Sequence, residues 1–111
     1  MGAAVRTFAA LADPGRCLVV EHLAEAPRSA GELAALAGLS KSAMSRHLRV
    51  LLEAGLVADD RSPEDARVRM FRIRPEGFDV TTQWWRDVQA HWERTLASYA
   101  EHVERRQRDE R

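Results

Sequence analysis

A helix-period pattern of hydrogen-bond donors occurs in the stretch LSKSAMSRHLRVLLEAGLV, residues 39–57. The donors recur at i, i+3, i+4 and i+7 and are Ser42, Ser45, Arg46 and Arg49. This spacing places them on one face of a helix. Arginine can form two hydrogen bonds with a guanine edge, and short hydroxyls suit close approach to a phosphate backbone. Because no acidic residue occurs between Leu39 and Leu52, the face has the chemistry of a nucleic-acid-binding surface.

The same helix has an apolar face that would pack against the rest of a domain. This stripe consists of Met44, Leu48, Leu51 and Leu52. Lys41 and His47 lie at the margins of the polar face, and Ser40 is the predicted N-cap, so a phosphate contact by Ser40 would be secondary. The predicted DNA contacts are Ser40, Lys41, Ser42, Ser45, Arg46, His47 and Arg49. The alternative is an ordinary solvated helix face.

Two capping signals position this helix. Ser29 and Glu32 have the spacing of a capping box, which begins the preceding helix. Gly38 can adopt the left-handed conformation that ends that helix, and Ser40 can then cap the next one. Two helices joined by so short a turn must cross steeply. Upstream, the pattern predicts two further short helices, separated by Asp-Pro-Gly at residues 13–15.

After Gly55 the apolar period changes from that of a helix to that of strands. Two strand-like segments flank turn-forming residues at 62–65, which predicts a two-stranded hairpin with a charged tip. The arginines of this region are Arg61, Arg67, Arg69, Arg72 and Arg74. A hairpin beside the polar helix could place Arg67 or Arg69 on phosphates or in the minor groove. The alternative is that alternate arginines solvate the outer face of the hairpin.

The order of helix, tight turn, helix and hairpin is that of a winged helix-turn-helix. We therefore predict a mainly α fold with a small β-hairpin, about five helices and a two-stranded wing, in one domain over residues 1–111. The 17 basic and 17 acidic residues cancel, so only their distribution is informative. A single cysteine, Cys17, and the absence of a long apolar run predict a cytoplasmic protein with no membrane segment.

From about Pro75 the helical period returns, with a wide apolar stripe. The stripe includes Trp85, Val88, Trp92, Leu96, Tyr99 and Val103. An aromatic ligand pocket is one interpretation of these residues. We favour packing against a second copy of the chain, because isologous symmetry lets such a face meet itself. The helix is predicted over residues 76–105, and the charged tail that follows is expected to fray.

Three segments resemble the ArsR-type winged-helix repressors of bacteria, namely FAALADPGR, RSAGELAALAGLSKSAMSRHLRVLLEAGLV and RVRMFRI. The resemblance covers nearly the whole chain from Phe8 onward. It implies a homodimeric repressor that binds a palindromic operator in double-stranded DNA, with the helix over residues 40–54 in the major groove. It also implies that the first and last helices form the dimer interface. The interface residues expected on this basis are Phe8, Trp85, Val88, Trp92, Leu96 and Tyr99.

In many members of this family a metal or another inducer releases the DNA, but the family's metal sites are incomplete here. The best-known site has a Cys-x-Cys motif, and the corresponding stretch, SAGELAALAG, contains no thiol. On the last helix, His91 and His102 have the histidine spacing of a second site, whereas Gln89 and Arg105 stand at the companion positions. We therefore predict no metal and no cofactor, and favour exposed or interface histidines over an improvised zinc site. The ending WWRDVQAHWERTLASYAEHV resembles a metal-independent subgroup.

Other interpretations have less support. A winged-helix module that binds protein, without specific DNA binding, commonly has acidic or exposed apolar residues on its second helix. A metal-responsive repressor would have to use the last helix. An enzyme is not indicated, because the histidines are not accompanied by a nucleophile elbow, a phosphate loop or paired carboxylates. Cys17 has no resolving thiol and is expected to be a partly buried helix residue. A small-molecule inducer of unknown identity is compatible with this sequence.

Overall fold

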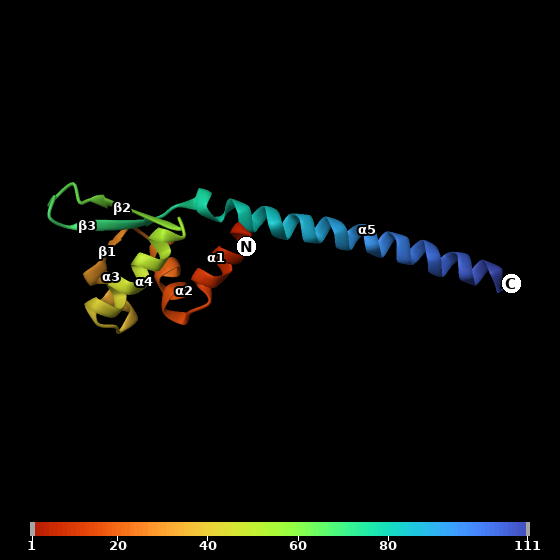
Figure 1. Cartoon of the computed structure of the whole chain (residues 1–111), viewed down its shortest axis with the longest axis horizontal. Coiled ribbons are helices and arrows are strands. Elements are labelled where there is room, and N and C mark those ends of the chain that lie inside the picture. Colours follow the sequence, from red (N-terminus) through yellow and green to blue (C-terminus); the bar gives the residue numbers. More distant parts are fainter. Residues whose placement is uncertain (1, 111) are drawn as a thin grey trace. The chain divides into compact units, whose positions relative to one another are not determined.

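The computed structural model describes residues 2–110 of the chain and is mainly helical (Figure 1). Its elements are α1 (Ala3–Leu11), α2 (Pro14–Leu23), β1 (Arg28–Ser29), α3 (Ala30–Ala37), α4 (Lys41–Glu53), β2 (Val57–Arg61), β3 (Arg69–Ile73), the 3-10 turn η1 (Pro75–Phe78) and α5 (Asp79–Asp109). The predicted fold class is confirmed. The chain divides into two compact units, one up to Thr81 and the other from Thr82.

The predicted capping residues define the helix-turn-helix formed by α3 and α4. The Glu32 backbone N–H donates to Ser29 Oγ at 3.2 Å, and the Ser29 N–H donates to Glu32 Oε1 at 3.2 Å. Gly38 ends α3 with a φ of 68°, in the left-handed region. Ser40 Oγ then accepts from the Ala43 N–H at 3.2 Å and begins α4. The starts of α3 and α4 therefore have the local hydrogen bonds that the sequence predicts.

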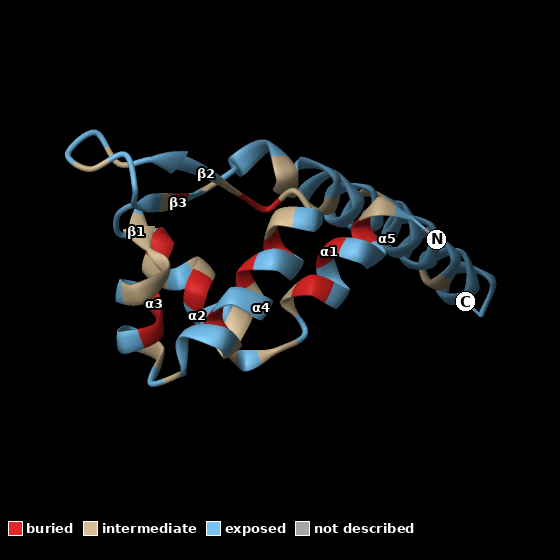
Figure 2. Ribbon diagram, turned by 60° about the vertical axis from the view of Figure 1, so that its left-hand side comes forward, coloured by how far each residue is buried: buried red, intermediate tan, exposed pale blue. Residues whose placement is uncertain are grey.

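The apolar stripe of α4 packs into the core of the first unit, where buried faces of the helices meet the hairpin (Figure 2). Met44, Leu48 and Leu51 are buried, and Leu52 packs at the edge of the same cluster. Phe71 enters this cluster from the hairpin. Burial of these side chains fixes the rotation of α4 about its own axis. The opposite face of α4 therefore points toward solvent.

The hairpin is one part of a three-stranded antiparallel sheet with the order β1-β3-β2. The register of β2 and β3 runs from Val57 opposite Ile73 to Arg61 opposite Arg69. This confirms the predicted wing, by which we mean residues 57–73. The third strand, β1, was not predicted, because a strand of two residues is too short to show an alternating pattern. It pairs with β3 and ties the start of α3 to the wing.

The second unit consists of the continuous helix α5 from Thr82 onward. The helix begins later than predicted, because residues 75–78 form a 3-10 turn, and it continues beyond residue 105 to Asp109. None of its described residues is buried. Most of its large apolar side chains are exposed, and these include Trp84, Trp85, Val88, Trp92, Leu96 and Tyr99. Within residues 2–110, none of the helices is long and apolar enough to cross a membrane.

Candidate nucleic-acid interface

The polar face of α4 is open to solvent. We define it as Lys41, Ser42, Ser45, Arg46 and Arg49, all of which are exposed. Its three cations have no ion pair or hydrogen bond to a side chain within the described part of the protein. Ser40, just before the helix, is also exposed, but its hydroxyl is already the N-cap and lies 3.4 Å from Ser42 Oγ. The structure thus brings most of the predicted residues onto one free surface.

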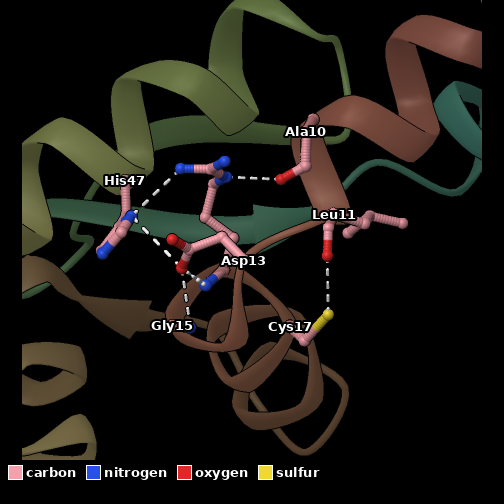
Figure 3. Close-up of polar contacts among 7 residues, drawn as sticks. Ala10, Leu11, Asp13, Gly15, Cys17 and His47 are labelled. Atoms are coloured by element: carbon pink, nitrogen blue, oxygen red, sulfur yellow. Dashed lines mark hydrogen bonds and ion pairs between the residues drawn. The ribbon is translucent and has the colours of Figure 1, made fainter.

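His47 is placed differently from the other predicted residues of α4. Its side chain is only 19% exposed, and Nδ1 lies 3.4 Å from Nη1 of Arg16 and 3.9 Å from Oδ1 of Asp13 (Figure 3). Arg16 also donates through Nε to the carbonyl of Ala10. A Cβ atom added to Gly15 would lie 3.0 Å from Nε2 of His47, so the imidazole packs directly on the start of α2. His47 therefore links α4 to the connection between α1 and α2.

The wing arginines that the sequence singles out are paired within the protein. Arg69 donates through Nε to Asp59 at 2.9 Å, and its guanidinium lies 5.1 Å from the centre of the Phe71 ring. Arg67 forms two hydrogen bonds with the Asp65 carboxylate, each of 3.1 Å, and its backbone N–H donates a third of 3.0 Å. Exposed pairs of this kind are individually weak. They nevertheless define where each guanidinium rests in the free protein.

A groove of about 650 Å³ separates α4 from the wing. Its polar lining contains Ser29, Lys41, Ser45, Arg49, Arg67 and Arg69. The structure therefore brings residues of α4 and of the wing to one concave surface, as expected for a recognition helix with an adjacent wing. Sequence reasoning assigned Ser29 to helix capping alone, and the pairing of β1 with β3 is what carries it to this groove.

The residues considered for sensing lie apart from this surface in the sequence. His91 and His102 are exposed on α5. Within residues 2–110, no three side chains of the metal-binding types gather closely enough to hold an ion. Cys17 is exposed rather than partly buried, and its Sγ donates to the Leu11 carbonyl at 3.0 Å. The prediction for Cys17 was wrong because it lies on the side of α2 opposite the buried Val19.

Asp13 is the N-cap of α2 and the acidic member of the contacts around His47 (Figure 3). Its Oδ1 accepts from the backbone N–H of Arg16 at 3.2 Å and from that of Gly15 at 2.8 Å. The hydrogen bond from Arg16, helped by that from Gly15, holds the pKa of Asp13 below its ordinary value of 3.8. The ionised carboxylate therefore stabilises this junction.

The substitution Asp13→Asn is expected to keep the N-cap hydrogen bonds of α2 and to remove the titratable carboxyl group. Because the folded pKa is the lower one, the charge stabilises the fold above pH 3.8, and this contribution is lost as the pH falls through the folded value. The difference in melting temperature between wild type and Asp13→Asn should thus shrink below that pH. Asp13→Ala should melt lower than Asp13→Asn at neutral pH, because alanine cannot cap. Equal melting of both variants at every pH would show that the cap contributes nothing.

Comparison with known proteins places this arrangement in a family. Residues 13–59 match the family described as bacterial regulatory protein, arsR family. The HTH-type transcriptional regulator Rv2034 of Mycobacterium tuberculosis is 37% identical over 99 residues, which cover 89% of this chain and 87% of the relative. The regulator NmtR of the same organism is 41% identical over 56 residues, which cover 50% of this chain and 47% of NmtR.

A solved structure agrees with these relatives. The ArsR-like transcriptional regulator from Rhodococcus sp. RHA1 superposes with a TM-score of 0.74 at 29% identity, covering 87% of this chain and 89% of that one. These similar proteins are transcriptional regulators, in agreement with the prediction that the chain is not an enzyme. The helix-turn-helix, the wing and the extent of the similarity lead to one conclusion. The chain belongs to the ArsR family of bacterial transcriptional regulators.

Proposed function

We propose that this protein is a homodimeric repressor that binds a palindromic operator in double-stranded DNA and acts in the cytoplasm. The observation that carries the proposal is the polar face of α4. It is exposed and free of acidic residues, and Lys41, Arg46 and Arg49 have no partner within the described part of the protein. Cations that are not neutralised by the fold are available to bases and phosphates.

We assign different tasks to the members of this face from their positions on α4. Arg46 and Arg49 lie one turn apart on α4, which suits contacts with successive base edges in a major groove. Ser42 and Ser45 lie beside them and can approach the backbone closely. Lys41, at the first turn of α4, is suited to a phosphate. His47 contributes by holding α4 on the junction of α1 and α2, and not by reaching DNA.

Dimerisation is proposed from the exposed apolar residues of the terminal helices. Trp92 on α5 is 58% exposed and Phe8 on α1 is 44% exposed, although both are large and apolar. The expected interface also contains Trp85, Val88, Leu96 and Tyr99. In a dimer with a two-fold axis, the apolar stripe of one protomer covers the same stripe of its partner. Such a dimer presents two α4 helices and therefore reads two half-sites of opposite orientation.

The test is selection of duplexes from a random-sequence library by the full chain, followed by anisotropy titrations of the enriched duplex. We expect an inverted repeat with half-sites about one helical turn, or a multiple of it, apart. We also expect binding that weakens steeply with salt. The double variant Arg46→Ala/Arg49→Ala serves as the control and should enrich no motif. If the wild type enriches none either and has no salt-dependent affinity, a protein-binding module replaces this proposal.

A further inference from the structure

Five arginines of the first unit are neutralised by carboxylates of the same protein. Ion pairs join Arg28 to Glu25, Arg67 to Asp65, Arg69 to Asp59, Arg72 to Asp60 and Arg74 to Glu76. Among residues 2–81, the side chains of Lys41, Arg46, Arg49 and Arg61 have neither an ion pair nor a hydrogen bond. Three of these belong to the polar face of α4. The fourth, Arg61, lies on the wing and needs a separate explanation.

The register of the wing places Arg61 on the same face of the sheet as two residues that line the groove. Arg61 is the last residue of β2 and is directly opposite Arg69 on β3. Partners in an antiparallel pair share a face, and so do residues two apart along a strand, so Arg61 and Arg69 share the face of Phe71. Phe71 is buried against the helices, and both Phe71 and Arg69 line the groove. Arg72 and Asp60 lie on the opposite face.

Arg61 lies opposite a residue of the same charge and, among the described residues, has no acidic partner of its own. Two like charges directly opposite each other destabilise a pair of strands. Asp59 compensates the charge of Arg69 at 2.9 Å, which leaves that of Arg61 without a counter-ion. The fold therefore gains no electrostatic stabilisation from Arg61. A ligand that brings negative charge to this face would interact favourably with its guanidinium.

We infer that Arg61 is the principal phosphate contact of the wing, in place of Arg67 and Arg69. Arg67 would have to leave the Asp65 carboxylate to bind a phosphate, and Arg69 would have to leave Asp59 and the Phe71 ring. Arg61 gives up no contact. The inference rests on the proposed DNA binding and makes it more specific. Arg69 then acts as a positioning residue that keeps Asp59 neutralised beside the groove.

The experiment compares Arg61→Gln with Arg72→Gln in the full chain. Both changes remove one positive charge from the same hairpin, but from opposite faces, so effects of net charge are matched. The probe is a fluorescent duplex of mixed sequence, titrated by anisotropy from about 50 to 200 mM KCl. For Arg61→Gln we expect the slope of log K against log salt to become shallower by about 0.9 per protomer. Arg72→Gln should keep the wild-type slope.

Two further variants separate contact from structure. Arg61→Lys should retain the slope, because lysine preserves the charge that binds phosphate. The melting temperature of Arg61→Gln should equal or exceed that of the wild type, because the side chain of Arg61 forms no ion pair or hydrogen bond within residues 2–110 that the variant would remove. If Arg67→Gln or Arg69→Gln makes the slope shallower while Arg61→Gln does not, the inference is wrong but the proposed function stands. An equal decrease in the salt slope for Arg61→Gln and Arg72→Gln would also overturn the inference. A wild type without salt-dependent binding refutes the proposed function itself.

Discussion

Arg46→Ala is expected to weaken binding of the selected operator duplex by about 1 to 3 kcal/mol, or about 5- to 150-fold, for each half-site. Arg46 is exposed near the middle of the polar face of α4, and no side chain in the described part of the protein pairs with its guanidinium. A guanidinium in this position can donate two parallel hydrogen bonds to a guanine. Alanine removes both and preserves the helix, because its helix propensity is the highest.

The measurement is a pair of anisotropy titrations, one with the selected duplex and one with the mixed-sequence duplex. If Arg46 contacts a base, Arg46→Ala should lose more affinity for the selected duplex than for the mixed-sequence duplex. Arg46→Lys tests the geometry, because lysine has the charge without the bidentate fork and should recover only the binding to the mixed sequence. Equal losses of Arg46→Ala on both duplexes would mean that Arg46 contacts phosphate alone. Unchanged binding to both would remove Arg46 from the interface.

Trp92→Ala is expected to raise the dissociation constant of the homodimer by about 1000-fold. Trp92 lies in the exposed stripe of α5, between Val88 and Leu96 on the same face. Truncation of a central aromatic residue in an interface costs at least about 2 kcal/mol, and the symmetry applies this cost twice. The resulting 4 kcal/mol corresponds to about 1000-fold. A monomer presents one α4 helix and should also lose most of its affinity for the inverted repeat.

Sedimentation velocity over a range of concentrations measures the dimer directly. Arg94→Ala is the matched control, because Arg94 is exposed on the same helix two residues away and therefore on a different face. Far-ultraviolet circular dichroism should show equal helix content in both variants. A dimer that survives Trp92→Ala with unchanged affinity would place the interface elsewhere. A wild type that sediments as a monomer at all concentrations would refute dimerisation altogether.

The sequence alone predicted the features that depend on neighbouring residues. The capping box at Ser29 and Glu32, the turn at Gly38 and the cap at Ser40 appear in the structure with the expected hydrogen bonds. These features depend on contacts between residues three or four apart, so they can be recognised directly in the amino-acid sequence. The apolar period of α4 likewise predicted which of its faces is buried, because a helix has a fixed number of residues per turn.

Only the tertiary structure decided how the charged side chains of α4 and of the paired strands β2 and β3 are partnered. His47 faces Arg16 and Asp13, which are distant in sequence, and no pattern within α4 distinguishes it from the residues of the polar face. The register of β2 and β3 decided that Asp59 neutralises Arg69 and that Arg61 has no counter-ion. Sequence shows which charges a hairpin contains, whereas strand register decides which of them meet. For this protein the sequence therefore determined the family and the polar face of the helix at residues 41–53, and the fold decided which cations of the first unit remain without a partner.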